Sequence, residues 1–429
     1  MSLKRLSLRL KPDAGRVVVR PFNISAEPRN LNPTDLPRAQ RIVDRVLALS
    51  DDEILAQNEA VLRLFHMRHR TLDRVIAMRI HQIGPLLDRF DGASESAKWL
   101  IAAHFCHEYS FEAAALFNPS IIAHFDQPWS LTRKLRFILS MRAVGEGHIS
   151  SVVFRTGVWR PGDGVELDPP QDCAEVAQSA DPAMPYTEDG SASVVRPRET
   201  PLGELVIFPM TPAQRNGIED MRLTEFTDND GAKTYYGTYT AFSGSGISPG
   251  LMTTPDFFTF HLRPLTGAAA INKGMALFPR RIDGGYAMLT RTDNESLFFA
   301  RSDDVLRWDD AVRILSPKYS WEFIQIGNCG APIEIDEGWL VLTHAVGAMR
   351  QYSLGACLLD KKDPTKVLAR SPQPILAPQD DEREGYVPNV LYTCGALRAG
   401  KHLLIPYGIS DRMVGFATCT VSELLDLLE

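Results

Sequence analysis

The sequence predicts a mainly β protein, a five-bladed β-propeller that follows an N-terminal α-helical extension. Two observations lead to this prediction. From about residue 135 onward, short apolar and aromatic segments alternate with turns of small or polar residues, as the strands of antiparallel hairpins do. Residues 35–115 instead carry apolar side chains at helical spacing.

The N-terminal part begins with a strand and continues with helices. Residues 1–22 alternate like a strand and lack the continuous apolar stretch of a signal peptide. A first helix is expected to start near Asp35, and a second after Ser50, where Glu53 completes the pattern of a capping box. A later helix is expected to continue to about Phe117. We expect these helices to pack on the second half of the chain or on a second subunit.

The second half repeats one plan five times: a strand, a turn, a second strand and often a polar close. Four strand starts are Tyr236, Tyr286, Trp339 and Leu403. They lie 50, 53 and 64 residues apart, and a period near 50 with a central hairpin is typical of propeller blades. A β-sandwich is the alternative architecture. It gives no reason why the close Asp256…Phe260 recurs as Asp304…Trp308.

The predicted domains follow from this change of pattern. Residues 1–115 form the N-terminal strand and helical extension, and residues 116–429 form the propeller. Residues 160–205 interrupt the repeats with a segment rich in Pro, Gly, Asp and Glu that shows no clear period. We predict an irregular surface insertion there, which could act as a lid.

Composition excludes several classes of function. The net charge of −7 gives no basic field for nucleic acid or acidic lipid, and no apolar segment approaches membrane-spanning length. The six cysteines are scattered without a CxxC pair, which favours free thiols in a reducing cytoplasm. Two histidine pairs, His66/His69 and His104/His107, lack nearby acidic or cysteine partners at the spacing typical of zinc sites, so no metal site is expected.

One short motif raises a chemical question. In GIEDMR, residues 217–222, two carboxylates stand side by side, Glu219 and Asp220. Neighbours on a strand point to opposite faces, so at most one of them is expected to enter a given cleft. An acid catalyst needs a raised pKa in a secluded site, and a second carboxylate nearby is one way to raise it.

Taken together, the strand-end motifs resemble those of glycoside hydrolase family 130, five-bladed propellers that act on β-mannosides. The resemblance covers about 315 of the 429 residues, from about residue 115 onward. In chain order the matching motifs are Phe117-Asn118-Pro119, Arg142-Ala143, Gly217-Ile218-Glu219-Asp220-Met221-Arg222, Asn272-Lys273-Gly274-Met275-Ala276-Leu277-Phe278-Pro279, Met288-Leu289-Thr290-Arg291, Ser302-Asp303-Asp304 with Trp308, Gly330-Ala331-Pro332, Gly338-Trp339-Leu340, His344, Leu358-Leu359-Asp360 with Asp363-Pro364, and Tyr407-Gly408 with Asp411.

The resemblance implies roles for nine residues. Asp220 is the implied catalytic acid, which in phosphorylases of the family acts through a sugar hydroxyl. The implied substrate-binding residues are Asn118, Glu219, His344 and Asp411, with Glu219 on the face opposite to Asp220. The implied phosphate-binding residues are Arg142, Arg222, Lys273 and Arg291. Two positions depart from the family pattern, because Met221 replaces a proline after the acid and Thr290 replaces a histidine.

The resemblance also implies an inverting β-mannoside phosphorylase that forms mannose 1-phosphate, with inorganic phosphate as co-substrate and no other cofactor. An inverting β-1,2-mannosidase and a non-catalytic carbohydrate-binding propeller remain alternatives. A mannosidase needs a carboxylate base, for which Glu382 and Glu384 are candidates. The expected partner is a small oligosaccharide, and the N-terminal helices could mediate a homo-oligomer. Linkage and acceptor sugar stay open.

Overall fold

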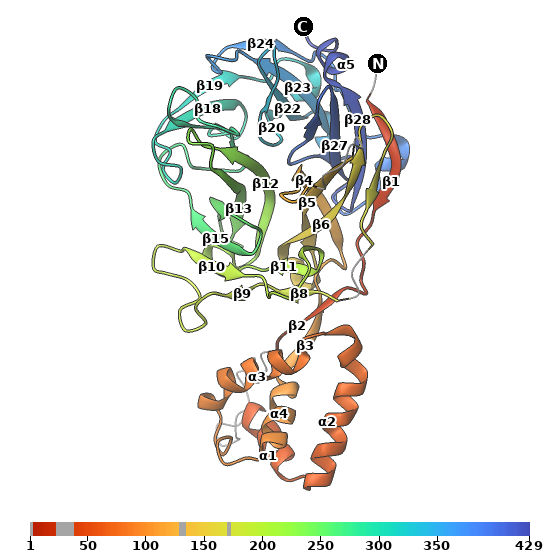
Figure 1. Cartoon of the computed structure of the whole chain (residues 1–429), viewed down its shortest axis with the longest axis vertical. Coiled ribbons are helices and arrows are strands. Elements are labelled where there is room, and N and C mark those ends of the chain that lie inside the picture. The colour runs from red at the N-terminus through yellow and green to blue at the C-terminus, as the bar shows by residue number, and fades with distance from the viewer. Residues whose placement is uncertain (1–2, 23–37, 128–133, 170–172) are drawn as a thin grey trace. The chain divides into compact units, whose positions relative to one another are not determined.

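The computed structural model describes residues 3–22, 38–127, 134–169 and 173–429. The chain forms two compact units (Figure 1), which we call the β unit and the helical unit. The β unit contains Met1–Asp13, Glu112–Pro170 and Val176–Glu429, and the helical unit contains Ala14–Phe111 and Gln171–Glu175. The protein is mainly β, as the sequence predicts. None of the described helices is both long and apolar enough to cross a membrane.

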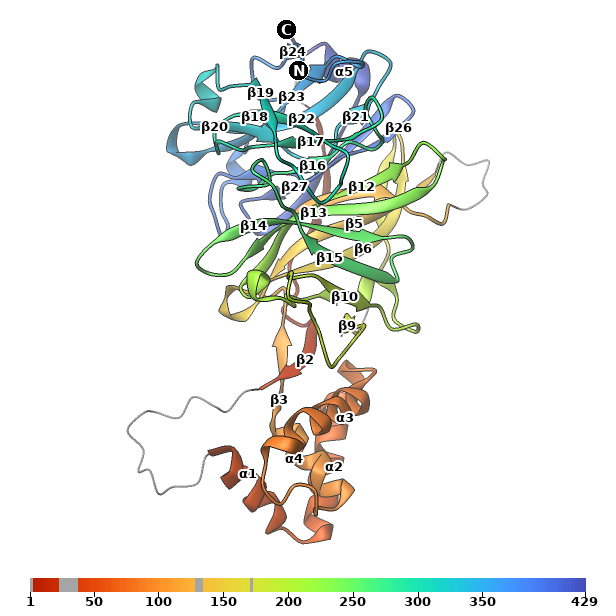
Figure 2. The same ribbon diagram turned by 90° about the vertical axis from the view of Figure 1, so that its left-hand side faces the viewer.

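The helical unit packs four helices around an apolar core (Figure 2). They are α1 (Arg38–Leu47), α2 (Asp51–Phe65), α3 (Leu72–Ile83) and α4 (Glu95–His104). The predicted capping box is confirmed, because the Ser50 side chain accepts from the Glu53 amide and the Glu53 carboxylate accepts from the Ser50 amide. The core includes Val43, Ile76 and Ile101. The predicted first-helix start near Asp35 lies outside the described residues.

The predicted end of the last helix is wrong. Helix α4 ends at His104, and Cys106–Ser110 forms strand β3, which pairs antiparallel with β2 (Val17–Pro21). No proline or glycine occurs after His104 until Pro119, so the local sequence does not indicate that the helix ends at His104. The extended partner strand, with its β-branched run of valines, supplies the backbone hydrogen bonds that a further helical turn would have made.

The β unit is built from successive antiparallel groups of strands that follow one another in chain order (Figure 1). The first group holds β4 (Ala115–Ala123), β5 (Leu135–Val144), β6 (Ser150–Arg160) and β7 (Gly164–Leu167). The second group holds β12 (Gly217–Thr227), β13 (Lys233–Phe242), β14 (Ile247–Thr254) and β15 (Thr259–Pro264), and the third holds β16 (Ala276–Leu277), β17 (Tyr286–Thr290), β18 (Leu297–Ser302) and β19 (Ala311–Leu315). The fourth group holds β20 (Gln325–Asn328), β21 (Ile333–Glu334), β22 (Trp339–Val346), β23 (Tyr352–Leu359) and β24 (Val367–Arg370), and the fifth holds β25 (Leu391–Tyr392), β26 (Leu397–Ala399), β27 (His402–Ile409) and β28 (Met413–Thr420), followed by helix α5 (Val421–Leu425). A parallel contact between Gly217 and Ser150 joins the first two groups into one sheet.

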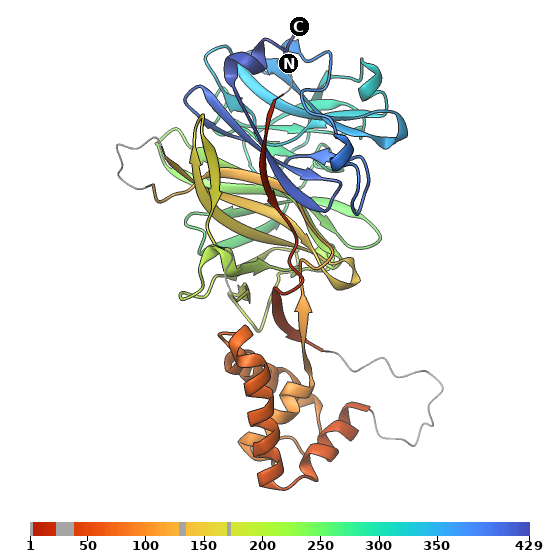
Figure 3. The ribbon, with the colours of Figure 1, turned by 90° about the vertical axis from the view of Figure 1, so that its right-hand side faces the viewer.

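The first strand of the chain belongs to the last group of the β unit. Strand β1 (Lys4–Leu10) pairs antiparallel with β28 and runs alongside it in Figure 3. This differs from the predicted division, which placed the strand with the helical extension. The reason is an edge effect: β28 would otherwise present an unpaired row of backbone groups, and β1 covers them.

The segment 160–205 is not wholly irregular. Besides β7, it contains the short strands β8 (Glu175–Val176), β9 (Gln178–Ser179) and β10 (Ala192–Val195), and β11 (Leu205–Ile207) follows. Strand β10 pairs with β15, and β11 pairs with β6, so both extend sheets of the β unit. Such two- to four-residue strands carry too little periodicity to be seen among prolines and glycines.

The repeated aspartate in the turn after a strand, Asp256 and Asp304, has a physical explanation. The Asp256 carboxylate accepts from the Phe258 amide at 2.8 Å, and the Asp304 carboxylate accepts from the Leu306 amide at 2.9 Å. Both are side-chain turns that end one strand and start the next. Trp308 is fully buried, as expected of a residue that packs within a sheet group.

Candidate active site

The adjacent carboxylates lie at an irregularity in strand β12. The pairing of β12 with β13 shifts register between Glu219 and Arg222, and Asp220 has a φ of 50°. A bulge of this kind breaks the alternation of side chains and re-aims one of them. As a result both carboxylates contact Arg142. The expectation that Glu219 and Asp220 point to opposite faces is therefore wrong.

The same device occurs on the preceding group of strands. Strand β4 shifts register between Phe117 and Ser120, and Asn118 has a φ of 48°. Its Nδ2 donates to an oxygen of the Asp220 carboxylate at 2.7 Å. Left-handed backbone at non-glycine residues costs free energy and persists where the surroundings enforce it, often at functional sites. Asn118 and Asp220 both have this strained backbone and contact each other, which identifies their position as a candidate functional site.

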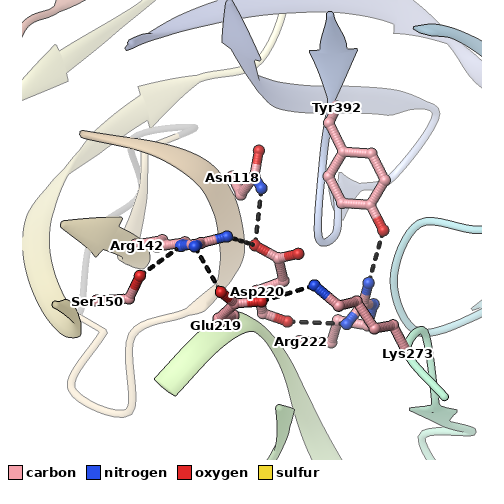
Figure 4. Close-up of polar contacts among 8 residues, drawn as sticks. All are labelled: Asn118, Arg142, Ser150, Glu219, Asp220, Arg222, Lys273 and Tyr392. Carbon is pink, nitrogen blue, oxygen red and sulfur yellow. Dashed lines mark hydrogen bonds and ion pairs between the residues drawn. The ribbon is translucent and has the colours of Figure 1, made fainter. Parts of the chain in front are cut away.

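Two cationic side chains, Arg142 and Lys273, contact the carboxylate pair (Figure 4). Arg142 donates to Glu219 at 2.6 Å and lies 3.5 Å from Asp220, while its Nε donates to the Ser150 hydroxyl. Lys273 Nζ donates to the other oxygen of Glu219 at 2.7 Å. Glu219 is thus held between two cations, whereas Asp220 contacts Arg142 alone of these two.

The charge balance around Asp220 sets its protonation. Burial acts to raise the pKa of this carboxyl, but Arg142, Lys273 and Arg222, together with the Asn118 hydrogen bond, lower the pKa below its ordinary value. Without a bound ligand, Asp220 is therefore an anion at neutral pH. The raised pKa expected of an acid does not arise here from the neighbouring Glu219.

Arg222, which is predicted to bind phosphate, donates to acceptors of the protein itself. Its guanidinium is 2% exposed and donates to three neutral acceptors, the carbonyl oxygens of Cys329 and Asp220 and the hydroxyl of Tyr392. The Cys329 and Asp220 bonds are 2.7 and 2.8 Å long. Its Nε and one N–H of each terminal nitrogen are engaged by protein, so Arg222 holds the backbone of the bulge in place and adds positive charge to the site.

Arg291 and His344 contact each other and form a second part of the site, in which Arg291 carries the positive charge. Arg291 Nη1 lies 3.0 Å from His344 Nε2, and the other ring nitrogen of His344 lies 3.2 Å from the Asn328 carbonyl oxygen. A carbonyl only accepts, so Nδ1 carries the proton and Nε2 accepts from Arg291. Burial, followed by the charges of Arg291 and Arg222, lowers the pKa of His344 well below its ordinary value, so the ring is neutral.

The guanidinium of Arg291 is buried without a carboxylate partner in the described chain. The residue is 8% exposed, and its Nε has no hydrogen-bond partner. Burial lowers the pKa of Arg291, although Asp220 is close enough to oppose that effect. Asn118 Oδ1 and Thr290 Oγ1 are also buried without partners. Buried polar groups of this kind are costly unless a ligand or water satisfies them.

Asp411 belongs to the same site, because its charge interacts with those of Asp220, Arg142 and Glu219. It lies in the turn after β27 with a φ of 49° and is half-buried. Burial and then the charge of Asp220 raise the pKa of Asp411 to about 7, against the opposing charges of Arg142 and Arg350. The site thus holds one carboxylate that is ionised and one that titrates near neutral pH.

The sequence did not single out Ser150, Tyr392 or Arg350, which complete this network. Tyr392 lies in β25, the first strand of the fifth group, as Asn118 and Asp220 lie in the first strands of the first and second groups. That equivalence was a usable signal. The described residues contain no group of His, Cys, Asp and Glu side chains suited to a metal ion.

Neither of the two glutamates considered as a hydrolytic base is well placed. Glu382 is 1% exposed, accepts from the Tyr407 hydroxyl at 2.8 Å, and forms ion pairs with Arg5 and Arg9 of β1 at 3.2 and 3.5 Å. This buried network holds the segment before β25 against β1 and β27. Glu384 is exposed.

A family model agrees with this arrangement. The model of glycoside hydrolase family 130, described as β-1,4-mannooligosaccharide phosphorylase, matches residues 190–429, more than half of the sequence. The chain belongs to glycoside hydrolase family 130. Of the predicted site residues, Asn118 and Arg142 lie before the matched stretch, and the others lie within it.

Characterised family 130 relatives share about half of this chain. A β-1,2-mannobiose phosphorylase of Listeria innocua is 34% identical over 230 residues, which are 52% of this chain and 63% of the relative. A 1,2-β-oligomannan phosphorylase of Thermoanaerobacter is 34% identical over 228 residues, 52% of this chain and 75% of the relative. A β-1,4-mannooligosaccharide phosphorylase of Ruminococcus albus is 33% identical over 192 residues, 42% and 57% of the two chains.

Solved structures of the family share the fold. The Listeria innocua β-1,2-mannobiose phosphorylase, in complex with β-1,2-mannobiose, superposes with a TM-score of 0.53 at 23% identity, over 73% of this chain and 92% of that one. A family 130 structure described with glycoside hydrolases that target β-1,2-mannosidic linkages in Candida mannan superposes with a TM-score of 0.52 at 19% identity, over 73% and 87%. At these identities the likeness concerns the fold alone.

Proposed function

We propose that this family 130 protein is an inverting β-mannoside phosphorylase that cleaves a β-mannosidic bond with inorganic phosphate and releases mannose 1-phosphate. The relatives named above are phosphorylases of β-mannosides, which supports the reaction class. The observation that carries the proposal is Arg291, a buried guanidinium without a carboxylate partner in the described chain, beside His344 and close to Asp220. An anion bound there would offset the cost of burying that charge.

In this proposal Asp220 supplies the proton for the leaving group. A phosphate oxygen attacks the anomeric carbon on one face while the bond to the leaving oxygen breaks on the other, and that oxygen takes up a proton. Asp220 is an anion when the cations around it are uncompensated. A phosphate dianion beside Arg291 and Lys273 would offset their field and raise the pKa of Asp220, which couples acid strength to phosphate binding.

Glu219 would then act on the sugar side. Glu219 is fixed by two cations and accepts hydrogen bonds at a defined position, which suits a sugar hydroxyl. Asn118 orients the Asp220 carboxylate. Lys273, whose side chain is 37% exposed, is the one of these cations that can turn from Glu219 towards an incoming anion.

The test is turnover of β-1,2- and β-1,4-mannobiose with and without inorganic phosphate, with mannose 1-phosphate and free mannose assayed separately. We expect mannose 1-phosphate, formed only when phosphate is present. Free mannose at equal rates with and without phosphate would refute the proposal. The same assay decides the linkage.

One observation favours a mannosidase as the second candidate. Asp411, with a pKa of about 7, has the proton affinity that suits a general base for water. Glu382 does not, because two arginines and a tyrosine hydroxyl already occupy its carboxylate. Were the enzyme a hydrolase, Asp411→Asn would abolish release of free mannose, whereas Glu382→Gln would mainly destabilise the fold.

We infer that the five antiparallel groups are the blades of a propeller, with β1 completing the last blade. Their order around the centre in Figure 1 and the likeness to family 130 structures support this inference. We also propose a cytoplasmic location, in keeping with six free cysteines. A homo-oligomer through the helical unit stays a prediction, which light scattering of the full chain and of a variant with altered helix surfaces would test.

A further inference from the structure

Three loops of the β unit meet beside Asp411. They are the turn 145–149 between β5 and β6, the turn 347–351 between β22 and β23, and the segment 380–390 before β25. The Tyr386 hydroxyl lies 2.8 Å from His148 Nδ1 and so links the first loop to the third. The Tyr352 amide, just after the second loop, donates to the Asn389 carbonyl oxygen at 3.0 Å.

The third loop is also fixed to the turn that carries Asp411. The Val387 amide donates to the Ser410 carbonyl oxygen at 3.1 Å, and the Ser410 hydroxyl donates to the Glu382 carbonyl oxygen at 2.7 Å. A Cβ at Gly385 would lie 2.3 Å from the same Ser410 oxygen, so the two backbones are in close contact. The position of Tyr386, next in the chain, is therefore tied to that of Asp411.

Tyr386 is exposed but held in place. Its residue exposure is 49%, and its ring centroid lies 5.8 Å from that of His148 at an angle of 41°. An exposed aromatic ring that is held by a neighbouring ring and by its hydroxyl presents a fixed apolar face to solvent. Such a face fits the C–H face of a pyranose ring.

Strained backbone surrounds this ring. His148, Met349 and Arg350 all have left-handed φ angles, of 58°, 54° and 56°. Met349 and Arg350 are not residue types that favour this region, so tertiary structure enforces it at these two positions. The positive charge of Arg350 acts on Asp411, so the guanidinium lies near that carboxyl.

We propose that Tyr386, His148 and Arg350 form the subsite for the sugar that leaves, or in the reverse direction accepts, the mannosyl group. The ring of Tyr386 stacks on the sugar, and the imidazole and guanidinium bond to its hydroxyls. The ligand is a neutral pyranose, such as the reducing-end unit of a β-mannobiose. This inference rests on the proposed function and locates its acceptor sugar on the Asp411 side, away from Arg291.

The test uses the full chain in the direction of synthesis, with mannose 1-phosphate as donor and mannose as acceptor. Tyr386→Ala is expected to raise the KM for mannose about fivefold or more, while kcat and the KM for mannose 1-phosphate change less than about twofold. Tyr386→Phe keeps the ring and should restore most of the acceptor affinity. The matched control is Tyr186→Ala, which removes another exposed tyrosine (41% exposed) on the loop between β9 and β10.

Equal effects of Tyr386→Ala and Tyr186→Ala would overturn the subsite, as would an equal rise in the KM for mannose 1-phosphate. If the wild-type chain turns over no mannoside, the proposed function fails separately. The subsite is then judged by saturation-transfer NMR with β-mannobiose and cellobiose. Contacts that Tyr386→Ala abolishes and Tyr186→Ala keeps would support it, and no contact, or contacts unchanged in both variants, would overturn it.

Discussion

Replacing Asp411 by asparagine should stabilise the β unit relative to the wild type, by an amount that grows as the pH rises. The folded chain keeps the proton of Asp411 up to its pKa of about 7, whereas the unfolded chain releases it near the ordinary value of 3.8. Folding therefore takes up a proton between these two pH values, and wild-type stability falls as the pH rises from about 4 to 7. The asparagine of the variant has no proton to take up, and this residue type tolerates the left-handed φ of 49° at the position.

The size of the effect follows from the shift in pKa. A rise from 3.8 to about 7 corresponds to at most about 4 kcal/mol of unfolding free energy, and screening at a half-buried side chain should reduce this to about 2 kcal/mol. The charges that face Asp411 are Asp220, Glu219, Arg142 and Arg350. Since Asp220 and Glu219 repel the ionised form, the variant loses a repulsion rather than a stabilising contact.

The assay is urea unfolding of both chains at pH 4.5, 6 and 8, followed by the fluorescence of the buried tryptophans of the β unit, Trp159, Trp308 and Trp339. The difference between Asp411→Asn and wild type should be small at pH 4.5, grow to pH 7 and stay level above it. Asp381→Asn removes an exposed carboxylate of the neighbouring segment and serves as control. A stability difference that is the same at all three pH values would refute the reasoning.

Three further predictions concern the site and the fold. Asp220→Asn should lower the turnover of mannobiose about hundredfold or more without loss of fold, because asparagine accepts its φ of 50°; activity near that of wild type would move the acid elsewhere. Lys273→Ala should raise the KM for phosphate about tenfold and leave the KM for mannobiose nearly unchanged, so equal losses in both would make Lys273 a sugar contact. Gly267→Ala should destabilise the β unit by about 3 kcal/mol, because a Cβ there would lie 2.2 Å from the Trp308 carbonyl oxygen at a φ of 102°. Gly164→Ala, where a Cβ would meet nothing within 4 Å, should change the unfolding midpoint little, and equal effects of the two would contradict this explanation.

Much of the fold was open to prediction because its signals are local. The capping box at Ser50 and Glu53, the strand starts near Tyr286 and Trp339, and the Asx turn at Asp304 each depend on a few consecutive residues. The short strands of segment 160–205 and the strand β3 were missed, because they form only where a distant partner supplies hydrogen bonds.

The candidate site shows the same division. Motifs in chain order identified which side chains matter, and their contacts in the structure bring together Asn118, Arg142, Glu219, Asp220 and Lys273 from separate groups of strands. The motifs could not reveal that Arg222 donates hydrogen bonds to the Cys329 carbonyl oxygen and the Tyr392 hydroxyl, because these acceptors lie 107 and 170 residues away in the chain.

The amino-acid sequence by itself determined the mainly β class and the order of the strand groups, since these follow from periodicity and turn residues, whereas the candidate site residues came from the resemblance of its motifs to family 130. Only the tertiary structure decided that adjacent carboxylates share one side. A bulge between Glu219 and Arg222 is enforced by the pairing of β12 with β13 and by contacts from other groups, and alternation along a strand predicts the opposite. Protonation also depended on the structure, because the pKa of Asp220 and that of Asp411 are set by charges from different groups of strands.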